Sequence, residues 1–295
     1  MIERVGSVTI SVPDIDAALA FYRNKVGLVE SERSDDSVYL TSNERHHELI
    51  LRQGEGNGNA LLSFNLQVSD GALDAAVDRA LAAGAVLLAD STHTGVAAAK
   101  TLRAPDGFTI ELFSGMAARP TDVTLAENPP LHFSHFNLGT PDAKATSDFF
   151  IQAFGMEPSD WLGDPKAPFL TWLHCPVLGA NHHGVAILQS DETKLHHIAF
   201  DYGNVQQVVD RVDGYVDETH YLVWGMGRHG TGGSLFSYIE DPGDMLVELG
   251  TGMIRIGVDA RWSGPKVWAM DDRRGVDAWG SGVPDAWLAK STPLV

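Results

Sequence analysis

The chain carries several of its most reactive side chains close together near residue 240. A histidine, a tyrosine and a glutamate, His229, Tyr238 and Glu248, are separated by two strand-like segments, SLFSYIE and DMLVELG. Alternation places Glu248 on the same strand face as Leu246, so a carboxylate stands among apolar side chains. Burying a carboxylate is costly unless a cation pairs with it. The alternative is an edge-strand glutamate that reaches solvent.

Two histidines on other predicted strands favour a cation. His135 lies in LHFSHFNLG and His197 lies in LHHIAFDYG, and both segments alternate as strands do. If these strands are equivalent members of one curved sheet, both imidazoles converge with Glu248. Two neutral imidazoles and one carboxylate on one side of a metal leave open positions, as in non-haem iron(II) oxygenases. A single histidine is more often structural, but three such residues at repeat-equivalent positions predict a metal site.

Further proton-carrying groups lie in the same part of the chain. Nine of the twelve histidines lie between His132 and His229. His183 stands at the head of the strand-like segment GVAILQS, and His229 and Tyr238 flank the turn GTGG. Histidine transfers protons near neutral pH, and tyrosine can donate to an oxyanion. Three other histidines are interpreted as surface residues or as residues behind the site: His132, His182 and His196.

A repeat explains how such distant residues could meet. A strand, a helix and three further strands recur four times, with a period of roughly fifty to sixty residues. The four units begin at SVTISV, ALLSFNLQV, LHFSHFNLG and LHHIAFDYG, and their helices follow at DIDAALAFYRNKVG, ALDAAVDRALAAGA, AKATSDFFIQAFG and NVQQVVDRVDGY. The predicted fold is therefore α+β, with four βαβββ units paired into two domains, each a curved mixed sheet with helices outside.

The predicted domains follow from the polar, proline-rich segment in the middle of the chain. They are a non-catalytic N-terminal domain (1–117), a linker (118–130), a catalytic metal-binding domain (131–252) and a tryptophan-rich tail (253–295). The tail holds four of the seven tryptophans. We expect it to be irregular and anchored by its aromatic side chains. It either closes the substrate cavity, over its own domain or a neighbouring subunit, or packs far from the site.

Laying one half over the other predicts that only the C-terminal half binds metal. SVTISVPD aligns with SHFNLGTPD, and RAPDGFTIELFSG aligns with EDPGDMLVELGTG. In this overlay Val8 stands where His135 stands, and Ser63 stands where His197 stands. Glu111 stands where Glu248 stands. The N-terminal half keeps the glutamate but has neither histidine.

Composition narrows the classes of partner. The chain has 295 residues and a formal net charge of −18, which argues against nucleic acid or an anionic membrane surface as a partner. Cys175 is the only cysteine, so the chain can form neither an intrachain disulfide nor a cysteine zinc site. We see no signal peptide and no apolar run of membrane-spanning length, and we expect a cytoplasmic protein.

The C-terminal half resembles the type I extradiol (ring-cleaving) catechol dioxygenases of the vicinal-oxygen-chelate superfamily. The resemblance rests on SHFNLG, NHHGVAI, LHHIAF and the spacing His-x8-Tyr-x9-Glu from His229 to Glu248. It implies that His135, His197 and Glu248 bind Fe(II), with Mn(II) as the alternative. It further implies that His183 is the acid–base catalyst and that His229 and Tyr238 hydrogen-bond the substrate's oxygens.

The reaction that the resemblance implies is extradiol (meta) cleavage of a catecholic ring by O2, in the degradation of aromatic compounds. The product would be of the 2-hydroxymuconate-semialdehyde type, and we expect a homo-oligomer. The segment between Trp172 and His182 is slightly long for the family, and the tail lies outside its motifs, so the catechol stays open. The alternatives are another metalloenzyme of the superfamily, an isomerase or thiol transferase, and a non-enzymatic small-molecule binding module.

Overall fold

The computed structural model describes residues 1–91, 94–217 and 219–295. None of the helices in these ranges combines the length and apolar character that crossing a membrane requires. In the first half the strands and helices are β1 (Ile2–Val12), α1 (Ile15–Phe21), a π-helical turn η1 (Tyr22–Val26), β2 (Val29–Arg33), β3 (Ser37–Thr41), β4 (Leu49–Gln53), β5 (Ala60–Val68), α2 (Leu73–Ala82), β6 (Val86–Ser91), β7 (Val96–Arg103) and β8 (Thr109–Met116).

The second half repeats this order. Its elements are β9 (His132–Thr140), α3 (Ala143–Phe154), β10 (Glu157–Asp164), β11 (Ala167–His174), β12 (Val185–Gln189), β13 (Lys194–Tyr202), α4 (Val205–Tyr215), β14 (Trp224–Arg228), β15 (Leu235–Glu240) and β16 (Leu246–Thr251). The tail adds β17 (Lys266–Trp268), the 3-10 turn η2 (Arg273–Gly275) and α5 (Asp285–Leu288).

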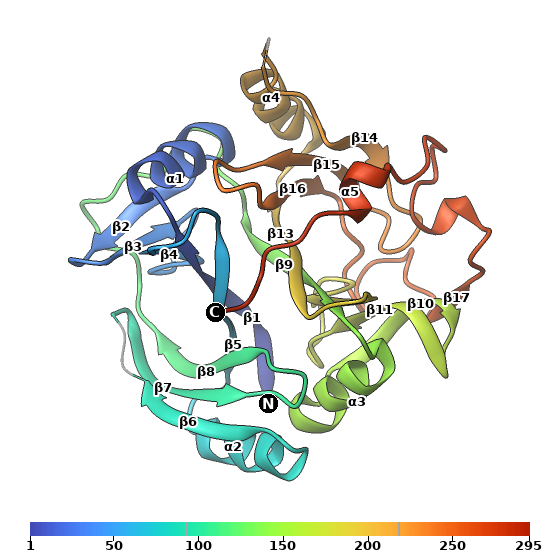
Figure 1. The fold of residues 1–295 in the computed structure, drawn as a ribbon, viewed down its shortest axis with the longest axis horizontal. Helices are drawn as coiled ribbons and strands as arrows, with labels where there is room; N and C mark the ends of the chain where they lie inside the picture. Colours follow the sequence, from blue (N-terminus) through green and yellow to red (C-terminus); the bar gives the residue numbers. More distant parts are fainter. Residues whose placement is uncertain (92–93, 218) are drawn as a thin grey trace.

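Each half forms one mixed sheet with the same internal order. The strand orders are β2-β3-β4-β1-β5-β8-β7-β6 and β14-β15-β16-β13-β9-β12-β11-β10-β17. In both sheets the first strands of the two units pair antiparallel at the centre, and the last strand of each unit runs parallel to its first. Helices α1 to α4 lie at the periphery in Figure 1. The predicted α+β fold of four βαβββ units is confirmed.

Local sequence signals define where the helices begin and end. Asp14, Asp142 and Asn204 stand just before α1, α3 and α4, and their side chains accept hydrogen bonds from backbone N–H groups of the first turn. Helix α3 ends at Gly155, whose φ of 67° is a left-handed conformation that glycine adopts without steric cost. These signals mark the starts of three of the four helices that the sequence predicts, and the start of α2 has no side-chain cap.

Three strands were not predicted: β10, β14 and β17. Strand β10 contains Pro158, Asp160 and Gly163, and β14 contains glycines on either side of Met226. Neither has the alternation of apolar residues that marks a half-buried strand. Their conformation depends on the neighbouring strands with which they pair, β11 and β17 for β10 and β15 for β14.

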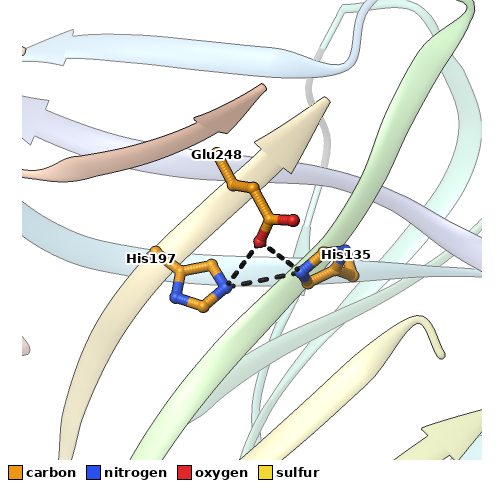
Figure 2. A group of neighbouring side chains, drawn as sticks. All are labelled: His135, His197 and Glu248. Atoms are coloured by element: carbon orange, nitrogen blue, oxygen red, sulfur yellow. Dashed lines mark hydrogen bonds and ion pairs between the residues drawn. The ribbon is translucent and has the colours of Figure 1, made fainter. Parts of the chain in front are cut away.

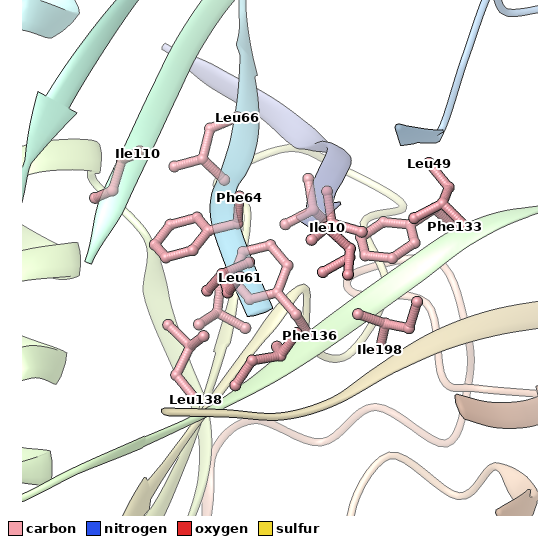
Figure 3. Packing of buried hydrophobic residues seen from close by; sticks show 14 of the residues in the cluster. Ile10, Leu49, Leu61, Phe64, Leu66, Ile110, Phe133, Phe136, Leu138 and Ile198 are labelled. Carbon is pink, nitrogen blue, oxygen red and sulfur yellow. The ribbon is translucent and has the colours of Figure 1, made fainter. Parts of the chain in front are cut away.

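One apolar core joins the two halves. Phe64 and Leu66 of the first sheet and Phe136 and Leu138 of the second belong to one buried cluster, and Figure 3 shows them facing one another. The rings of Phe64 and Phe136 have centroids 4.6 Å apart. Residues 117–131 contain no helix or strand. The two-domain division therefore stays an interpretation, because the halves share their core.

Exchange of Phe136 for alanine should lower the free energy of unfolding by about 3–5 kcal/mol, as is typical of a large-to-small change at a buried aromatic residue. Phe136 has no exposed surface. A double-mutant cycle with Phe64→Ala should give a coupling of about 0.5–1.5 kcal/mol for the ring pair. Chemical denaturation measures both. Leu131→Ala, at a side chain that is 55% exposed, is the control with an effect near zero. Zero coupling would mean that the halves do not share this contact.

The tail runs over the second half and ends on the first. Strand β17 extends the second sheet by pairing parallel with β10. Near the end, Thr292 exchanges backbone hydrogen bonds with Leu195 at 2.9 and 3.0 Å, and Pro293 accepts a hydrogen bond from Leu61 at 2.8 Å. Figure 1 shows the C-terminus beside β1 and β5. The tail thus contacts the second sheet at β10 and β13 and the first sheet at β5.

Candidate metal centre

Three side chains meet on one face of the second sheet. His135 comes from β9, His197 from β13 and Glu248 from β16, which are adjacent strands of that sheet. Oε2 of Glu248 lies 3.3 Å from Nε2 of His135 and 3.4 Å from Nε2 of His197, and the two imidazole nitrogens are 3.4 Å apart (Figure 2). All three side chains are buried. The predicted convergence is therefore observed.

The spacing of these three atoms suits a metal ion. Bonds of about 2.0–2.2 Å from one ion to N and O ligands at roughly right angles place the ligand atoms about 3 Å apart. Among the residues described, His135, His197 and Glu248 form the one group of three or more such side chains whose ligand atoms lie within 4.8 Å of one another. Two imidazoles and a carboxylate match the ligand set of non-haem Fe(II) sites, and also suit Mn(II).

The tail determines which nitrogen of His197 faces this site. The backbone oxygen of Trp287 lies 2.9 Å from Nε2 of His196, and a carbonyl can only accept, so Nε2 of His196 carries the proton. Burial lowers the pKa of His196 well below its usual value, so Nδ1 is an acceptor. It accepts from Nδ1 of His197 at 2.8 Å. The free lone pair of His197 is then on Nε2, the atom that faces Glu248.

The protonation states around the site favour cation binding. Burial lowers the pKa of His197 to about 4, so its imidazole is neutral at neutral pH. Nδ1 of His135 lies 3.2 Å from Oγ of Ser134, which leaves Nε2 for a ligand. Lone pairs of two imidazoles and a carboxylate thus converge in a buried space.

His183 stands beside the ligand group, with a second histidine behind it. Its ring centroid is 4.3 Å from that of His135, and its Nδ1 is 3.2 Å from Nδ1 of His182. Nε2 of His182 lies 3.4 Å from the buried carboxylate of Asp160. A carboxylate can only accept, so Nε2 of His182 carries a proton, and Nδ1 of His182 can accept from Nδ1 of His183. This leaves the lone pair of His183 on Nε2, where it can accept a proton.

His229 and Tyr238 form the other side of the group. Nδ1 of His229 donates to the backbone oxygen of Val276 in the tail, and its Nε2 lies 3.3 Å from the hydroxyl of Tyr238. That hydroxyl donates to Oε2 of Glu248 at 2.8 Å. Burial raises the pKa of Tyr238 well above its usual value, so the phenol keeps its proton. Tyr238 therefore contacts a candidate ligand directly and lines the same cavity.

A small cavity connects all six of these side chains. Its volume is about 30 Å³, which is room for one or two water molecules. Leu170, Trp172 and Ala186 add apolar surface from β11 and β12, and Val276 and Trp287 add it from the tail. Trp287 packs on His196 and His197, with ring centroids at 4.2 and 6.0 Å. The tail thus covers the ligand group. Two placements were predicted for it, at the substrate cavity or far from the site, and the structure shows the tail at the cavity of its own chain.

Among the described residues of the first half, no comparable group is found, and the register corrects one prediction. In the first sheet, Val8 of β1 pairs with Leu49 of β4 and with Phe64 of β5. In the second sheet, Phe136 of β9 makes the matching pairs, with Val185 of β12 and Ile198 of β13. Val8 therefore corresponds to Phe136, one residue away from its predicted counterpart.

The position of His135 is taken by Ser7. Ser63 and Glu111 do correspond to His197 and Glu248, as predicted. Hydrogen bonds between neutral groups hold the serines: Asn65 donates to Ser7 at 2.9 Å and accepts from Ser63 at 2.8 Å. Because neither serine supplies an imidazole, the expectation of a metal-free first half does not depend on the corrected residue.

The sequence model of the Glyoxalase/Bleomycin resistance protein/Dioxygenase superfamily matches residues 4–112 and 132–249. The chain belongs to this superfamily. Each match covers one of the two halves, and the second contains all three candidate ligands. The superfamily members most informative for this chain are a curated relative and two solved structures.

Metapyrocatechase of Geobacillus stearothermophilus is 23% identical over 99% of this chain and 94% of its own length. Homoprotocatechuate 2,3-dioxygenase of Arthrobacter globiformis superposes with a TM-score of 0.86 at 24% identity, covering 100% of this chain and 92% of the other, which shows the shared fold. The Mn(II)-bound glyoxalase of Novosphingobium aromaticivorans gives 0.84 at 26% identity, with 97% and 93% covered. The predicted resemblance to extradiol dioxygenases is confirmed.

Several residues of the site were not predicted: Ser134, Asp160, Leu170, Val276 and Trp287. Asp160 lies on the unpredicted strand β10. The tail acts through backbone oxygens of Val276 and Trp287, and a backbone oxygen has no residue type to recognise. The sequence does hold one further signal of the repeat. The doublet His46-His47 precedes β4 as His182-His183 precedes β12, so His47 is the counterpart of His183 in the first half.

Replacing His196 with leucine should weaken metal binding by about 10–100-fold, as changes of groups that orient metal-ligating histidines usually do. The leucine cannot accept the Nδ1 proton of His197, so the ligand loses its fixed tautomer. Titration against a competing chelator measures the affinity. His182→Leu is the control: it should retain metal affinity and lower turnover, since His182 contacts His183 and Asp160. Equal metal affinity in both variants would contradict the assignment.

Proposed function

We propose that this protein is an extradiol dioxygenase, in which His135, His197 and Glu248 hold one Fe(II) and a catechol ring is opened by O2 beside its two hydroxyls. The observation that carries the proposal is the arrangement of the cavity. Three convergent ligand atoms share it with three further proton-carrying groups, His183, His229 and Tyr238. Bound Fe(II) would supply the redox chemistry that lets O2 react with the ring. The relation to metapyrocatechase supports the same reaction class.

The side chains around the ligands supply the proton transfers that the reaction needs. Burial lowers the pKa of His183 well below its usual value, so its Nε2 is free to take a proton from a catechol hydroxyl. The same imidazole can then give that proton to the outgoing oxygen when the O–O bond breaks. Both atoms of O2 stay in the ring-opened product, of the 2-hydroxymuconate-semialdehyde type, so the reaction needs no other oxidant or reductant.

His229 and Tyr238 would hold and orient the substrate. Burial lowers the pKa of His229, and its Nδ1 proton is directed to Val276, so Nε2 is left as an acceptor for a catechol hydroxyl. The Tyr238 phenol remains protonated and can donate to an anionic oxygen. It donates to Glu248, which would hold the metal, and it lines the cavity, so the phenol would lie within reach of a substrate oxygen.

The experiment that tests this function is anaerobic loading with Fe(II), followed by addition of catechols and O2. We expect O2 uptake equal to the catechol consumed and a yellow product, with Mn(II) loading as a parallel arm. The Mn(II)-bound glyoxalase supports the second candidate, a metal-dependent isomerase. A loaded protein that consumes no O2 with any catechol, but isomerises a hemithioacetal, would establish that candidate. A protein that binds no metal would support the non-enzymatic reading.

A further inference from the structure

The cavity wall beyond the ligands and the three proton-carrying groups is almost wholly apolar. Five apolar side chains form most of it: Leu170, Trp172, Ala186, Val276 and Trp287. Asn137 and Thr231 are the remaining lining side chains, and both are uncharged. Among the residues that the structure describes, no lysine or arginine lines this cavity. The formal charge on the wall is that of Glu248, which the metal would offset.

The wall is also backed by apolar side chains. Leu170, Trp172 and Ala186 belong to one buried cluster with Leu162 and Leu188, and Val276 packs against it. A charged group directed into this wall would therefore be met by hydrocarbon in the next layer as well. Burying a carboxylate without a cation or several hydrogen bonds is strongly unfavourable.

The nearest arginines along the chain do not supply a cation to the wall. Arg273 and Arg274 precede Val276 in the tail, but both are exposed. Arg274 donates from Nε to Asp272 at 2.8 Å, and a second bond joins its Nη2 to the same carboxylate. Arg228 ends β14 and is followed directly by His229. Adjacent residues of an extended chain point in opposite directions, which directs Arg228 away from the side of His229.

We propose that this site selects catechols whose ring substituent is neutral and apolar, and discriminates against dihydroxy aromatic acids. The inference rests on the proposed function and deepens it by stating the substrate class. The two hydroxyls are served by the metal ligands, His183, His229 and Tyr238, whereas the substituent must contact the apolar wall. The net charge of −18 acts in the same direction, because it disfavours the approach of an additional carboxylate.

The test uses pairs of catechols that carry a methyl group or a carboxylate at the same ring position: 4-methylcatechol with 3,4-dihydroxybenzoate, and 3-methylcatechol with 2,3-dihydroxybenzoate. In the Fe(II) protein, O2 uptake gives kcat/KM for each compound. In the protein loaded with redox-inert Zn(II), calorimetry gives Kd without turnover. We expect the methyl compound of each pair to be favoured about 100-fold or more in both measurements, since an unpaired buried charge is that unfavourable.

A designed cation should reverse part of this preference. Val276→Lys places an ammonium group in the wall and should raise the relative kcat/KM of the acid at least tenfold over wild type. Val276→Met, of similar length but uncharged, is the matched control and should change both members of a pair alike. Arg273→Gln and Arg274→Gln should leave the ratio unchanged.

The outcomes separate the two proposals. Acids that bind to the Zn(II) protein as tightly as their methyl partners, or more tightly, would overturn the substrate-class inference, even if catechols are cleaved. So would loss of acid binding in Arg273→Gln or Arg274→Gln, because the tail would then supply the cation. If the Fe(II) protein opens no member of either pair, the proposed function fails, and the Zn(II) affinities still decide the charge preference.

Discussion

Glu248→Ala is expected to yield a folded protein that retains no stoichiometric iron and cleaves no catechol. Glu248 is the anionic member of the ligand group, and its Oε2 lies 3.3 and 3.4 Å from the imidazole nitrogens of His135 and His197. Two neutral imidazoles that remain after its removal hold a divalent ion poorly. The loss of affinity should exceed the roughly 10–100-fold that residues behind the ligands typically contribute. Metal analysis after gel filtration and O2 uptake measure the two effects.

The first half of the chain provides the matched control. Glu111 occupies the equivalent strand position, is buried, and accepts a hydrogen bond from Ser91 at 2.7 Å. Glu111→Ala should therefore leave iron content and turnover at wild-type values, whatever it does to stability. Glu248→Gln keeps the shape of the side chain and tests whether charge is what the metal requires. Full iron content in Glu248→Ala would refute the ligand assignment, and so would loss of iron in Glu111→Ala.

The fold was predictable where a residue pattern reports directly on burial. The four helices have capping residues or apolar faces, and the central strands alternate or are continuously apolar. The strands β10 and β14 were not predictable, because Pro158 and Gly225 are residues that disfavour strands in isolation. Strand pairing overrides that preference in the folded chain. Strand β17 is three residues long, too short for any periodicity.

The candidate site was predictable to the extent that it depends on residue type and repeat position. His135 and His197 stand on the first strands of their units and Glu248 on a last strand, so the repeat indicated that they converge. The overlay of the halves was one residue out at Ser7, because the alignment of SVTISVPD with the longer SHFNLGTPD left the position of the extra residue open. Pairing with β4 and β12 removes that ambiguity.

The tail is the part of the site that the sequence could not place. Its tryptophans predicted packing, and Trp262, Trp268 and Trp287 do contact the body, while Trp279 is exposed. Its effect on chemistry comes from the positions of two backbone oxygens, which determine the tautomers of His196 and His229. Which carbonyl reaches which imidazole depends on the path of an irregular chain. No local residue pattern encodes that path.

His183→Ala is expected to keep iron and bind catechol while turnover falls by about 10²–10⁴, the usual contribution of a general acid–base group. Nδ1 of His183 is engaged with His182, and its ring lies beside His135, so Nε2 is the atom available to the cavity. Without it, the proton of a catechol hydroxyl has no base nearby, and the leaving oxygen has no acid. Metal analysis, anaerobic catechol titration and single-turnover kinetics separate these steps.

His47 is the control for this change. It holds the same position before β4 that His183 holds before β12, and it is fully buried. His47→Ala should lower stability without changing kcat, because Ser7 and Ser63 hold the positions that the two imidazole ligands hold in the second half. Two results would show that His183 has another role: iron lost from a folded His183→Ala protein, which would make it a ligand, or equal losses of kcat in both variants, which would make the effect one of packing. A loss of kcat confined to His183→Ala, with iron and catechol affinity retained, assigns the proton transfer to this imidazole.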